Sequence, residues 1–412
     1  MTSGLKIALV SEHADPLAAL GGADAGGQNV HVAALAAGLA RRGHEVVVHT
    51  RRTDPDAPAT VRAPGGYLVD RVTAGPAAEL AKDELLPYVP RLGEELAERW
   101  AADPVDVVHA HFWMSGLAAL RGVAGAGVPV VQTFHALGSV KRRHQGEADT
   151  SPPERIEREA RLCAEVDRVI ATCTDEVGEL ERLGLAPGRA SVIPCGVDTR
   201  QFRPGPGRVS PQGRHRVLVI GRMVPRKGVD TVIEAVADLP EVELVIAGGP
   251  PPARLEEDPH LRALCALAQR AGVAHRTRFL GGVAQRDVAA LIRGCSVVAT
   301  VPWYEPFGIT PLEAMACGRP VVGSAVGGLL DTVVPGRTGE LVPPRDPVAL
   351  AAALRELLAD PARRAAYGEE GRRRAVAHYD WDQVVRRTEE VYRDLARPVP
   401  ARQDRSSEEV AR

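Results

Sequence analysis

Residues 216–228 read Arg-Val-Leu-Val-Ile-Gly-Arg-Met-Val-Pro-Arg-Lys-Gly, and this stretch decides the fold class of the chain. The apolar run Arg216–Ile220 is typical of a strand that is buried on both faces of a sheet. A glycine-containing loop ends the run, and a helical pattern follows at Asp230–Asp238. A buried strand followed by a short loop and a helix is the repeating unit of a parallel sheet covered on both faces.

The same alternation continues on both sides of this stretch. In the second half of the chain the further predicted strands are Glu243–Ala247, Thr277–Leu280, Val297–Thr300 and Pro320–Gly323, and the further helices are Leu261–Ala271, Asp287–Arg293 and Pro311–Cys317. In the first half the predicted strands are Leu5–Ser11, Glu45–Thr50, Val105–Ala110, Val128–Phe134 and Arg168–Ala171, and the helices are Gln28–Arg42, Leu92–Ala101, Glu154–Ala164 and Thr174–Leu183. The sequence therefore predicts two α/β units in tandem, each with its own parallel sheet.

A segment rich in proline and glycine separates the two units. Residues 200–213 show no periodicity, which is typical of a linker between domains. We therefore predict an N-terminal parallel-sheet domain at 1–200 and a C-terminal one at 201–380, facing each other across a cleft. An amphipathic helix follows at 381–397, and the polar residues 398–412 are predicted to form a disordered tail.

Composition narrows the class of protein further. With 51 basic and 53 acidic side chains the net charge is −2, so bulk charge gives no reason to expect nucleic-acid binding. The six cysteines form no Cys-x-x-Cys pair, which favours free thiols in a reducing compartment. No apolar run approaches the roughly 18 residues of a membrane span, and we identify no signal peptide. We expect a cytoplasmic protein; a peripheral membrane contact and a homodimer both stay open.

Loops that follow the predicted strands carry the candidate ligand-binding groups. Ligands of open parallel sheets bind at the carboxyl ends of the strands. The glycine-rich loop Gly21–Gly27 leads into a helix, and it is either a cradle for a diphosphate or a flexible turn. Arg222, Arg226 and Lys227 follow another strand, and they either hold phosphate groups or are ordinary surface cations.

The segment Trp303–Ala314 is the most informative of these loops. Glu305 lies between aromatic residues and a proline, where a structural role is hard to assign. Glu313 has a structural alternative: if Thr310 is a helix N-cap, Glu313 closes a capping box. Two carboxylates that flank a helix start could together bind sugar hydroxyls and phosphate, because the first N–H groups of a helix have no intrahelical partner.

Histidines follow two strands of the first domain. His109 and His111 close one predicted strand, and His135 follows the next. A metal site would need a further close carboxylate or other ligand, and we predict none. We expect His109 to be structural and His135 to contact a ligand. The acidic pair at residues 54 and 56 lies in a proline-rich loop without supporting ligands, and we do not assign it to a metal.

Taken together, these segments resemble glycosyltransferase family 4 over residues 5–395. The matching motifs, in order along the chain, are Gly196-Val197-Asp198, Gly221-Arg222 with Lys227-Gly228, Glu305-x7-Glu313, and Gly327-Gly328. The resemblance implies the GT-B arrangement of two Rossmann-like domains that face each other across a cleft, with the C-terminal helix crossing back to the N-terminal domain. It also implies transfer of a hexosyl group from a nucleotide-diphosphate sugar, with retention of configuration and without a cofactor or catalytic metal. A uridine-diphosphate sugar is the expected donor.

The resemblance assigns roles to individual residues. The catalytic residues would be His135, which contacts the donor sugar, and Glu305, which holds the transferred hexose. The donor-binding residues would be Gly27, Arg222, Lys227, Phe307, Gly308, Ile309 and Glu313. The acceptor-binding residues would be Asn29, Lys82 and Arg155. From the residues alone, Lys82 and Arg155 are equally compatible with ordinary surface cations.

Two branches of the family share further segments with this chain, namely residues 24–30 and 109–116. One branch transfers N-acetylglucosamine to inositol phosphate, and the other makes sucrose or sucrose phosphate. The first branch holds the acceptor phosphate with a Lys, a Tyr, a Thr and an Arg. Phe112 and Ala136 occupy the Tyr and Thr positions here, so two hydroxyl donors are missing. The alternatives to a transferase are a degenerate nucleotide-sugar-binding protein and a GT-B-type epimerase.

Overall fold

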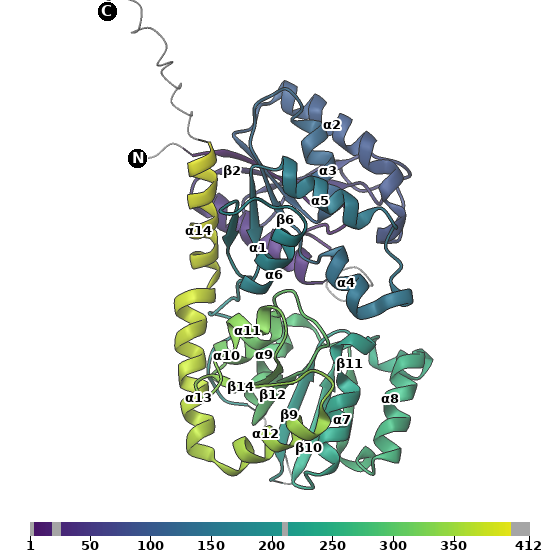
Figure 1. The fold of residues 1–412 in the computed structure, drawn as a ribbon, viewed down its shortest axis with the longest axis vertical. Coiled ribbons are helices and arrows are strands. Elements are labelled where there is room, and N and C mark those ends of the chain that lie inside the picture. Colours follow the sequence, from purple (N-terminus) through teal and green to yellow (C-terminus); the bar gives the residue numbers. More distant parts are fainter. Residues whose placement is uncertain (1–3, 19–25, 208–212, 397–412) are drawn as a thin grey trace, which may run out of the picture.

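The computed structural model describes residues 4–18, 26–207 and 213–396, which form two α/β domains stacked along the long axis of the molecule (Figure 1). This confirms the predicted α/β class with two Rossmann-like domains. The predicted disordered tail, most of the loop Gly21–Gly27 and part of the linker lie outside the described residues.

The N-terminal domain is built on a sheet of order β3-β4-β2-β1-β5-β6-β7-β8 within the described residues. Its strands are β1 Lys6–Val10, β2 Glu45–Arg51, β3 Thr60–Arg62, β4 Leu68–Val72, β5 Val107–His111, β6 Val130–Thr133, β7 Arg168–Ala171 and β8 Ala190–Val192. The helices are α1 Gly27–Arg41, α2 Val89–Ala102, α3 Trp113–Gly122, α4 Gly138–Gln145, α5 Arg155–Glu165 and α6 Thr174–Arg182, with short 3₁₀ turns η1 Lys82–Glu84, η2 Leu86–Tyr88 and η3 Gly146–Ala148. All pairings are parallel except that of β3 with β4 at the edge.

The C-terminal domain has the strand order β11-β10-β9-β12-β13-β14, and all its pairings are parallel. The strands are β9 His215–Ile220, β10 Val242–Ala247, β11 Thr277–Gly281, β12 Val297–Thr300, β13 Val321–Ser324 and β14 Gly339–Val342. The helices are α7 Val229–Ala237, α8 Pro259–Arg270, α9 Gln285–Arg293, α10 Ile309–Ala316, α11 Gly328–Thr332, α12 Pro347–Ala359 and α13 Pro361–Arg374, with 3₁₀ turns η4 Pro225–Lys227, η5 Pro252–Glu257 and η6 Ala274–Arg276.

In each sheet the direction of winding reverses beside the first strand of the domain. The reversal lies between β1 and β5 in the N-terminal sheet and between β9 and β12 in the C-terminal sheet. The loops that leave neighbouring strands there run to opposite faces, which opens a crevice for ligands. The candidate loops after β9 and β12 therefore flank one crevice, and those after β1 and β5 flank the other.

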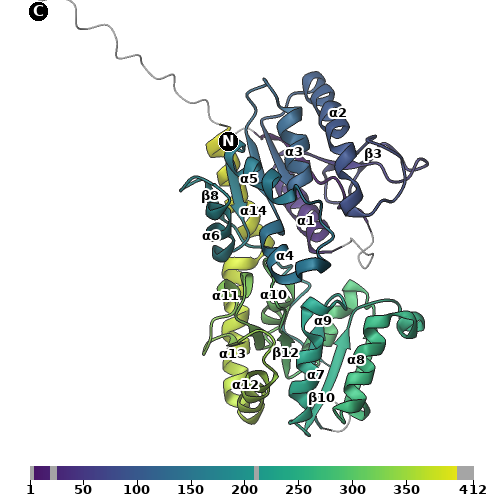
Figure 2. The same ribbon diagram turned by 45° about the vertical axis from the view of Figure 1, so that its right-hand side comes forward.

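The last helix, α14 Trp381–Leu395, leaves the C-terminal domain and packs on the N-terminal one (Figures 1 and 2). One π-helical turn, η7 Ala375–Tyr379, joins it to α13. Trp381 and Tyr392 belong to the same buried apolar cluster as Leu9 of β1 and Leu35 of α1. The amphipathic face of this helix is therefore part of the core of the first domain.

Several elements were not predicted, and local reasons account for β3, β8 and α3. The edge strands β3 and β8 are three residues long and half exposed, so they lack an apolar run. Helix α3 is buried on most sides, which removes the 3.6-residue alternation of apolar and polar positions. Residues 347–374 form the two helices α12 and α13, which meet at Asp360, and η7 then separates α13 from the last helix.

Candidate active site

The loop between β9 and α7 supplies cations to the crevice. Lys227 Nζ donates a hydrogen bond to Glu305 Oε2 of the loop after β12, and Arg226 Nη1 lies 4.0 Å from the same oxygen. Burial acts to raise the pKa of the Glu305 carboxyl, but Lys227 and Arg226 outweigh it and hold that pKa below its ordinary value. Burial lowers the pKa of Lys227, with Glu305 opposing the shift. Arg222 is exposed at the end of β9. The structure thus brings an ionised carboxylate and several cations into one corner.

Two glycine positions allow the loops around this corner to approach each other. Gly228 has φ +68°, and a Cβ there would lie 2.1 Å from the carbonyl oxygen of Val301, just after β12. Gly327 has φ +47°, and its Cβ would lie 2.1 Å from the carbonyl oxygen of Glu305. Only glycine fits such positions without strain. The Gly327-Gly328 motif therefore acts by letting the start of α11 close on the Glu305 loop.

Glu313 does not close a capping box, so that structural alternative is wrong. Helix α10 begins at Ile309 with Gly308 as its N-cap at φ 69°, and no side chain caps it. Thr310 is instead a helical residue whose hydroxyl donates to the carbonyl oxygen of Ile220 at 3.4 Å. The buried Glu313 carboxylate accepts a hydrogen bond from Gln285 Nε2 of α9 at 3.2 Å. Burial raises the pKa of Glu313 to about 7, with the Gln285 hydrogen bond opposing the shift.

The start of α10 also meets the N-terminal domain. A Cβ on Gly27, the first residue of α1, would lie 3.3 Å from Phe307 Cζ and 3.4 Å from Ile309 Cδ1. Two helix N-termini, those of α1 and α10, therefore lie close together at the crevice. Both present the backbone N–H groups of a first turn, which favour anions.

His135 is held in a strained backbone conformation beside this junction. Its φ is +60°, which is uncommon for a residue with a side chain, and such strain concentrates at functional sites. Its Nε2 shares a hydrogen bond of 3.0 Å with His111 Nδ1, whereas its buried Nδ1 has no partner among the described residues. The ring centroids of His135 and Phe307 are 6.2 Å apart. Burial and neighbouring histidines hold the pKa of His135 well below its ordinary value, so the ring is neutral at pH 7.

His109 is structural, as expected. The Thr133 hydroxyl donates to the carbonyl oxygen of Ile170 at 3.1 Å, so it accepts the 2.9 Å hydrogen bond from His109 Nε2. The neutral ring then accepts at Nδ1 from the Tyr392 hydroxyl of α14 at 2.6 Å. Both ring nitrogens are satisfied, and they connect β5 to α14.

The three predicted acceptor residues lie in different surroundings. Arg155 is 2% exposed, so its interpretation as a surface cation is wrong. It pairs with Glu159 at 2.7 Å, and its guanidinium lies 5.0 Å from the centre of the Phe112 ring. Lys82 Nζ lies 5.7 Å from the same ring centre. The buried Asn29 amide bonds to Gly26 N and to the carbonyl oxygen of Asp15, so it orders the loop before α1.

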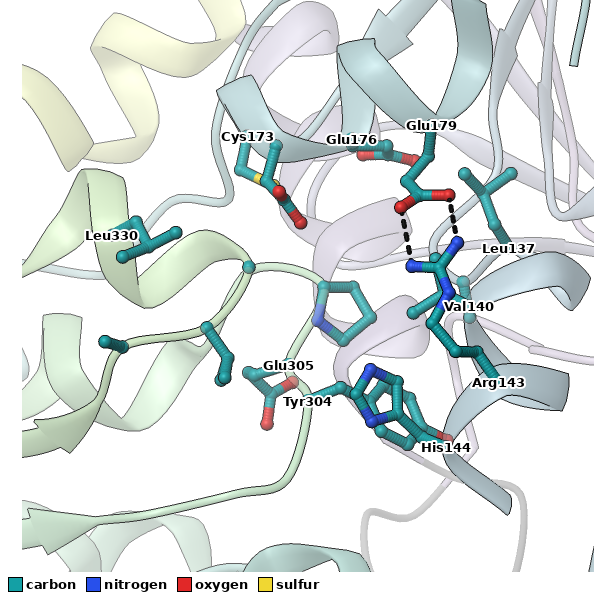
Figure 3. Close-up of a pocket in the computed structure, with 16 residues that line it drawn as sticks. Leu137, Val140, Arg143, His144, Cys173, Glu176, Glu179, Tyr304, Glu305 and Leu330 are labelled. Atoms are coloured by element: carbon teal, nitrogen blue, oxygen red, sulfur yellow. Dashed lines mark hydrogen bonds and ion pairs between the residues drawn. The ribbon is translucent and has the colours of Figure 1, made fainter. Parts of the chain in front are cut away.

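A pocket of about 240 Å³ lies between the two domains beside Glu305 (Figure 3). The N-terminal domain contributes Arg143 and Glu179, which form a two-pronged ion pair with N–O distances of 2.8 and 2.9 Å. The C-terminal domain contributes Tyr304, whose ring stacks on His144 at 4.9 Å between centroids. The pocket therefore has polar groups from both domains beside the loop after β12 that carries Glu305.

Sequence profiles of known families match both domains. The profile described as Glycosyltransferase Family 4 matches residues 25–201, and the one described as Glycosyl transferases group 1 matches residues 207–374. The chain is 38% identical to a D-inositol 3-phosphate glycosyltransferase from Kineococcus radiotolerans, over 98% of each chain. It is 36% identical to a D-inositol 3-phosphate glycosyltransferase 2 from Catenulispora acidiphila, over 94% of each.

The chain belongs to glycosyltransferase family 4. Among solved structures, a sucrose-phosphate synthase from Thermosynechococcus elongatus superposes with a TM-score of 0.86 at 34% identity, covering 95% of this chain and 99% of that one. This agreement confirms the GT-B arrangement. The chain is therefore a glycosyltransferase of the hexosyltransferase class.

Sequence reasoning missed several polar residues of this glycosyltransferase site. Glu12 lies two residues after the end of β1 at the reversal point and is 2% exposed. It accepts hydrogen bonds from Ser115 and from His13 Nδ1, the latter at 2.7 Å. Its place at a strand end was a usable signal. Arg143 and Glu179 gave none, because they lie on helices with ordinary charge patterns.

Two further features concern metals and membranes. Within residues 4–18, 26–207 and 213–396, no three His, Cys, Asp or Glu side chains are grouped so that they could hold a metal ion. Across the same residues, no helix combines the length and the apolar character needed to cross a membrane.

Proposed function

We propose that this glycosyltransferase moves a hexosyl group, with retention of configuration, from a uridine-diphosphate sugar to a hydroxyl of a small acceptor. The observation that carries the proposal is the Lys227–Glu305 ion pair at the reversal point of the C-terminal sheet, with Glu313 on the adjoining helix. A cation for the diphosphate, a carboxylate for the hexose and a carboxylate for the ribose lie along one crevice.

Charge gives each group a part in the reaction. As the sugar–phosphate bond breaks, the departing diphosphate gains negative charge and the sugar becomes oxocarbenium-like. Lys227, Arg222 and the N–H groups of Phe307, Gly308 and Ile309 stabilise that charge. A well-placed hydrogen-bond donor of this kind lowers the activation barrier by about 3–4 kcal/mol. Glu305, held ionised by its cations, accepts hydrogen bonds from the hexose hydroxyls.

The neutral His135 ring offers one hydrogen bond to the donor sugar through its unpartnered Nδ1. A neutral ring suits this position, since a cation there would oppose an oxocarbenium-like sugar. The acceptor hydroxyl attacks from the face of the leaving group, and a phosphate oxygen of the departing diphosphate takes its proton. No enzymic nucleophile is required.

The acceptor is proposed to be a small polyol that carries a phosphate. Lys82 and Arg155 support an anionic acceptor, because both lie over the Phe112 ring at the reversal point of the N-terminal sheet. The relatives are named for D-inositol 3-phosphate, which is the first acceptor to assay. Phe112 and Ala136 lack the hydroxyls expected for that acceptor, so hexose phosphates are the matched alternative.

The test is a nucleotide-release assay that crosses UDP-, GDP- and ADP-sugars with D-inositol 3-phosphate, free inositol and hexose phosphates. We expect release from a UDP-sugar that one phosphorylated acceptor stimulates, with an α-linked product by NMR. The Lys227→Ala variant should lose it, whereas Arg254→Ala, an exposed arginine paired with Glu257, should not. Release by Lys227→Ala at the wild-type rate would place the reaction elsewhere. A glycosyl adduct trapped on Glu305 with native donor would contradict the mechanism.

A further inference from the structure

A second cavity, of about 310 Å³, lies at the opposite edge of the C-terminal sheet from the loops after β9 and β12. These two loops carry Lys227 and Glu305, and we call them the donor loops. The cavity opens where β9, β12 and β13 begin, at the end of the domain that points away from the N-terminal domain (Figure 1). The donor loops leave the other ends of these strands. Because β9 has six residues, the two sites are separated by about 20 Å of sheet.

Arginines dominate this cavity, which we call the arginine cavity. Those that line it are Arg214, Arg216, Arg293, Arg319 and Arg364. No carboxylate lines it within the described part of the chain. Glu243 lies behind it, where it pairs with Arg216 at 3.0 Å and with Arg278 at 3.3 Å. One carboxylate therefore serves two arginines, and Asp360 acts on Arg364 from outside the lining. The charged side chains of the lining itself are all positive.

Backbone carbonyls orient three of the remaining arginines without neutralising their charge. Arg293 Nε donates to the carbonyl oxygen of Pro206 at 3.2 Å, and Arg319 Nη2 donates to that of Arg293 at 2.5 Å. Arg364 Nη1 donates to that of Leu357 at 3.0 Å. Each contact uses one side of a guanidinium, which carries five N–H donors. The buried Arg319 Nε has no hydrogen-bond partner among the described residues.

Like charges held this close repel one another, and partial burial weakens the screening by water. The hydrogen bonds to backbone carbonyls do not by themselves offset the repulsion among the five arginines around the cavity. A dianion in the cavity would accept hydrogen bonds from several guanidinium groups at once and relieve the repulsion. Phosphate suits this geometry because a guanidinium binds it through two parallel hydrogen bonds.

We propose that the arginine cavity binds a small phosphorylated metabolite at a site separate from the nucleotide-sugar crevice. The volume accommodates a phosphate ester and not only a single phosphate ion. A free metabolite fits better than a lipid headgroup, since the exposed large apolar side chains among the described residues, Leu17, Leu330, Val348 and Val376, do not line the cavity.

The test is calorimetric titration of the full chain with inorganic pyrophosphate, with sulfate at matched ionic strength for comparison. Pyrophosphate also resembles the donor diphosphate, so the variants separate the two sites. Arg214→Gln removes a half-buried arginine for which no hydrogen bond to the described chain is found, so folding should be unaffected. Arg214→Gln/Arg364→Gln removes two charges from the arginine cavity. Lys227→Ala removes the cation paired with Glu305 in the nucleotide-sugar crevice, and Arg254→Gln, at an exposed arginine, is the matched control.

We expect the dissociation constant for pyrophosphate to rise about tenfold in Arg214→Gln and further in the double variant. Lys227→Ala and Arg254→Gln should retain the binding to the arginine cavity. Without ligand, the melting temperature of Arg214→Gln should be no lower than that of wild type, because the substitution removes one of the charges that repel one another. The proposal is overturned if wild type does not bind pyrophosphate, or if only Lys227→Ala loses it. Binding to phosphatidylglycerol vesicles is measured in parallel to test a lipid headgroup as the ligand. The proposal is also overturned if the cavity variants lose binding to the vesicles but keep binding to pyrophosphate.

Discussion

The Glu313→Gln substitution should make the protein more stable and less active. The Glu313 carboxyl is buried, and its pKa is raised from 4.5 to about 7. At about 1.36 kcal/mol per pKa unit, ionising it in the folded state costs about 3 kcal/mol more than in the unfolded chain. Glutamine has nearly the same shape, and its amide oxygen can still accept the hydrogen bond from Gln285.

The sign follows from the raised pKa. The folded state binds the Glu313 proton more tightly than the unfolded chain does. The stabilisation that this proton gives to the wild type is therefore fully present below pH 4.5 and is lost as the pH rises through 7. The variant has no such loss. We therefore expect Glu313→Gln to be about 3 kcal/mol more stable than wild type at pH 8, and within about 1 kcal/mol of it at pH 5. For a domain of this size the gain at pH 8 raises the melting temperature by roughly 6–12 °C.

Scanning calorimetry at pH 5 and pH 8 measures the effect on the transition of the C-terminal domain. Glu305→Gln is the matched control, because the pKa of Glu305 is lowered. The ionised Glu305 carboxylate therefore stabilises the folded state above the pKa that the group has in the unfolded chain, and this stabilisation is lost in acid. Glu305→Gln should accordingly lower the free energy of unfolding at pH 8. Both variants should raise the donor KM. Equal pH dependence of stability in wild type and Glu313→Gln would refute the reasoning.

Three further substitutions test other parts of the site. Lys227→Met should lower kcat by about 100- to 1000-fold through loss of leaving-group stabilisation; a loss below about tenfold in the release assay would argue against that role. His135→Asn keeps a residue that tolerates the φ of +60° and removes the proposed hydrogen bond to the donor sugar, so it should lower kcat/KM in steady-state kinetics by roughly tenfold to a hundredfold. Tyr392→Phe removes the hydrogen bond to His109 and should cost about 1 kcal/mol in chemical denaturation, while an altered KM for either substrate would show that α14 does more than brace the domain.

Sequence patterns predicted the buried strands well, and they failed where burial is partial or complete on all sides. Strand β12 was predicted with the bounds it has in the structure, because three consecutive apolar residues are followed by the β-branched Thr300. Strand β8 at the sheet edge has no such run, and α3 has no polar face. Thr310 fitted the local rule for an N-cap, but α10 begins at Ile309, and its N-cap is Gly308 at φ 69°, a conformation that favours glycine.

The sequence by itself determined the two parallel sheets, the loops at their strand ends and the charges those loops carry. Periodicity and strand ends are local properties, so a single chain displays them. Only the tertiary structure decided that Lys227 pairs with Glu305, that Arg155 is buried against Glu159, and that five distant arginines share one cavity. The pKa of Glu313 likewise follows from its burial. Burial and charge pairing join residues far apart in the chain, and the crossing of helices and strands sets their distances.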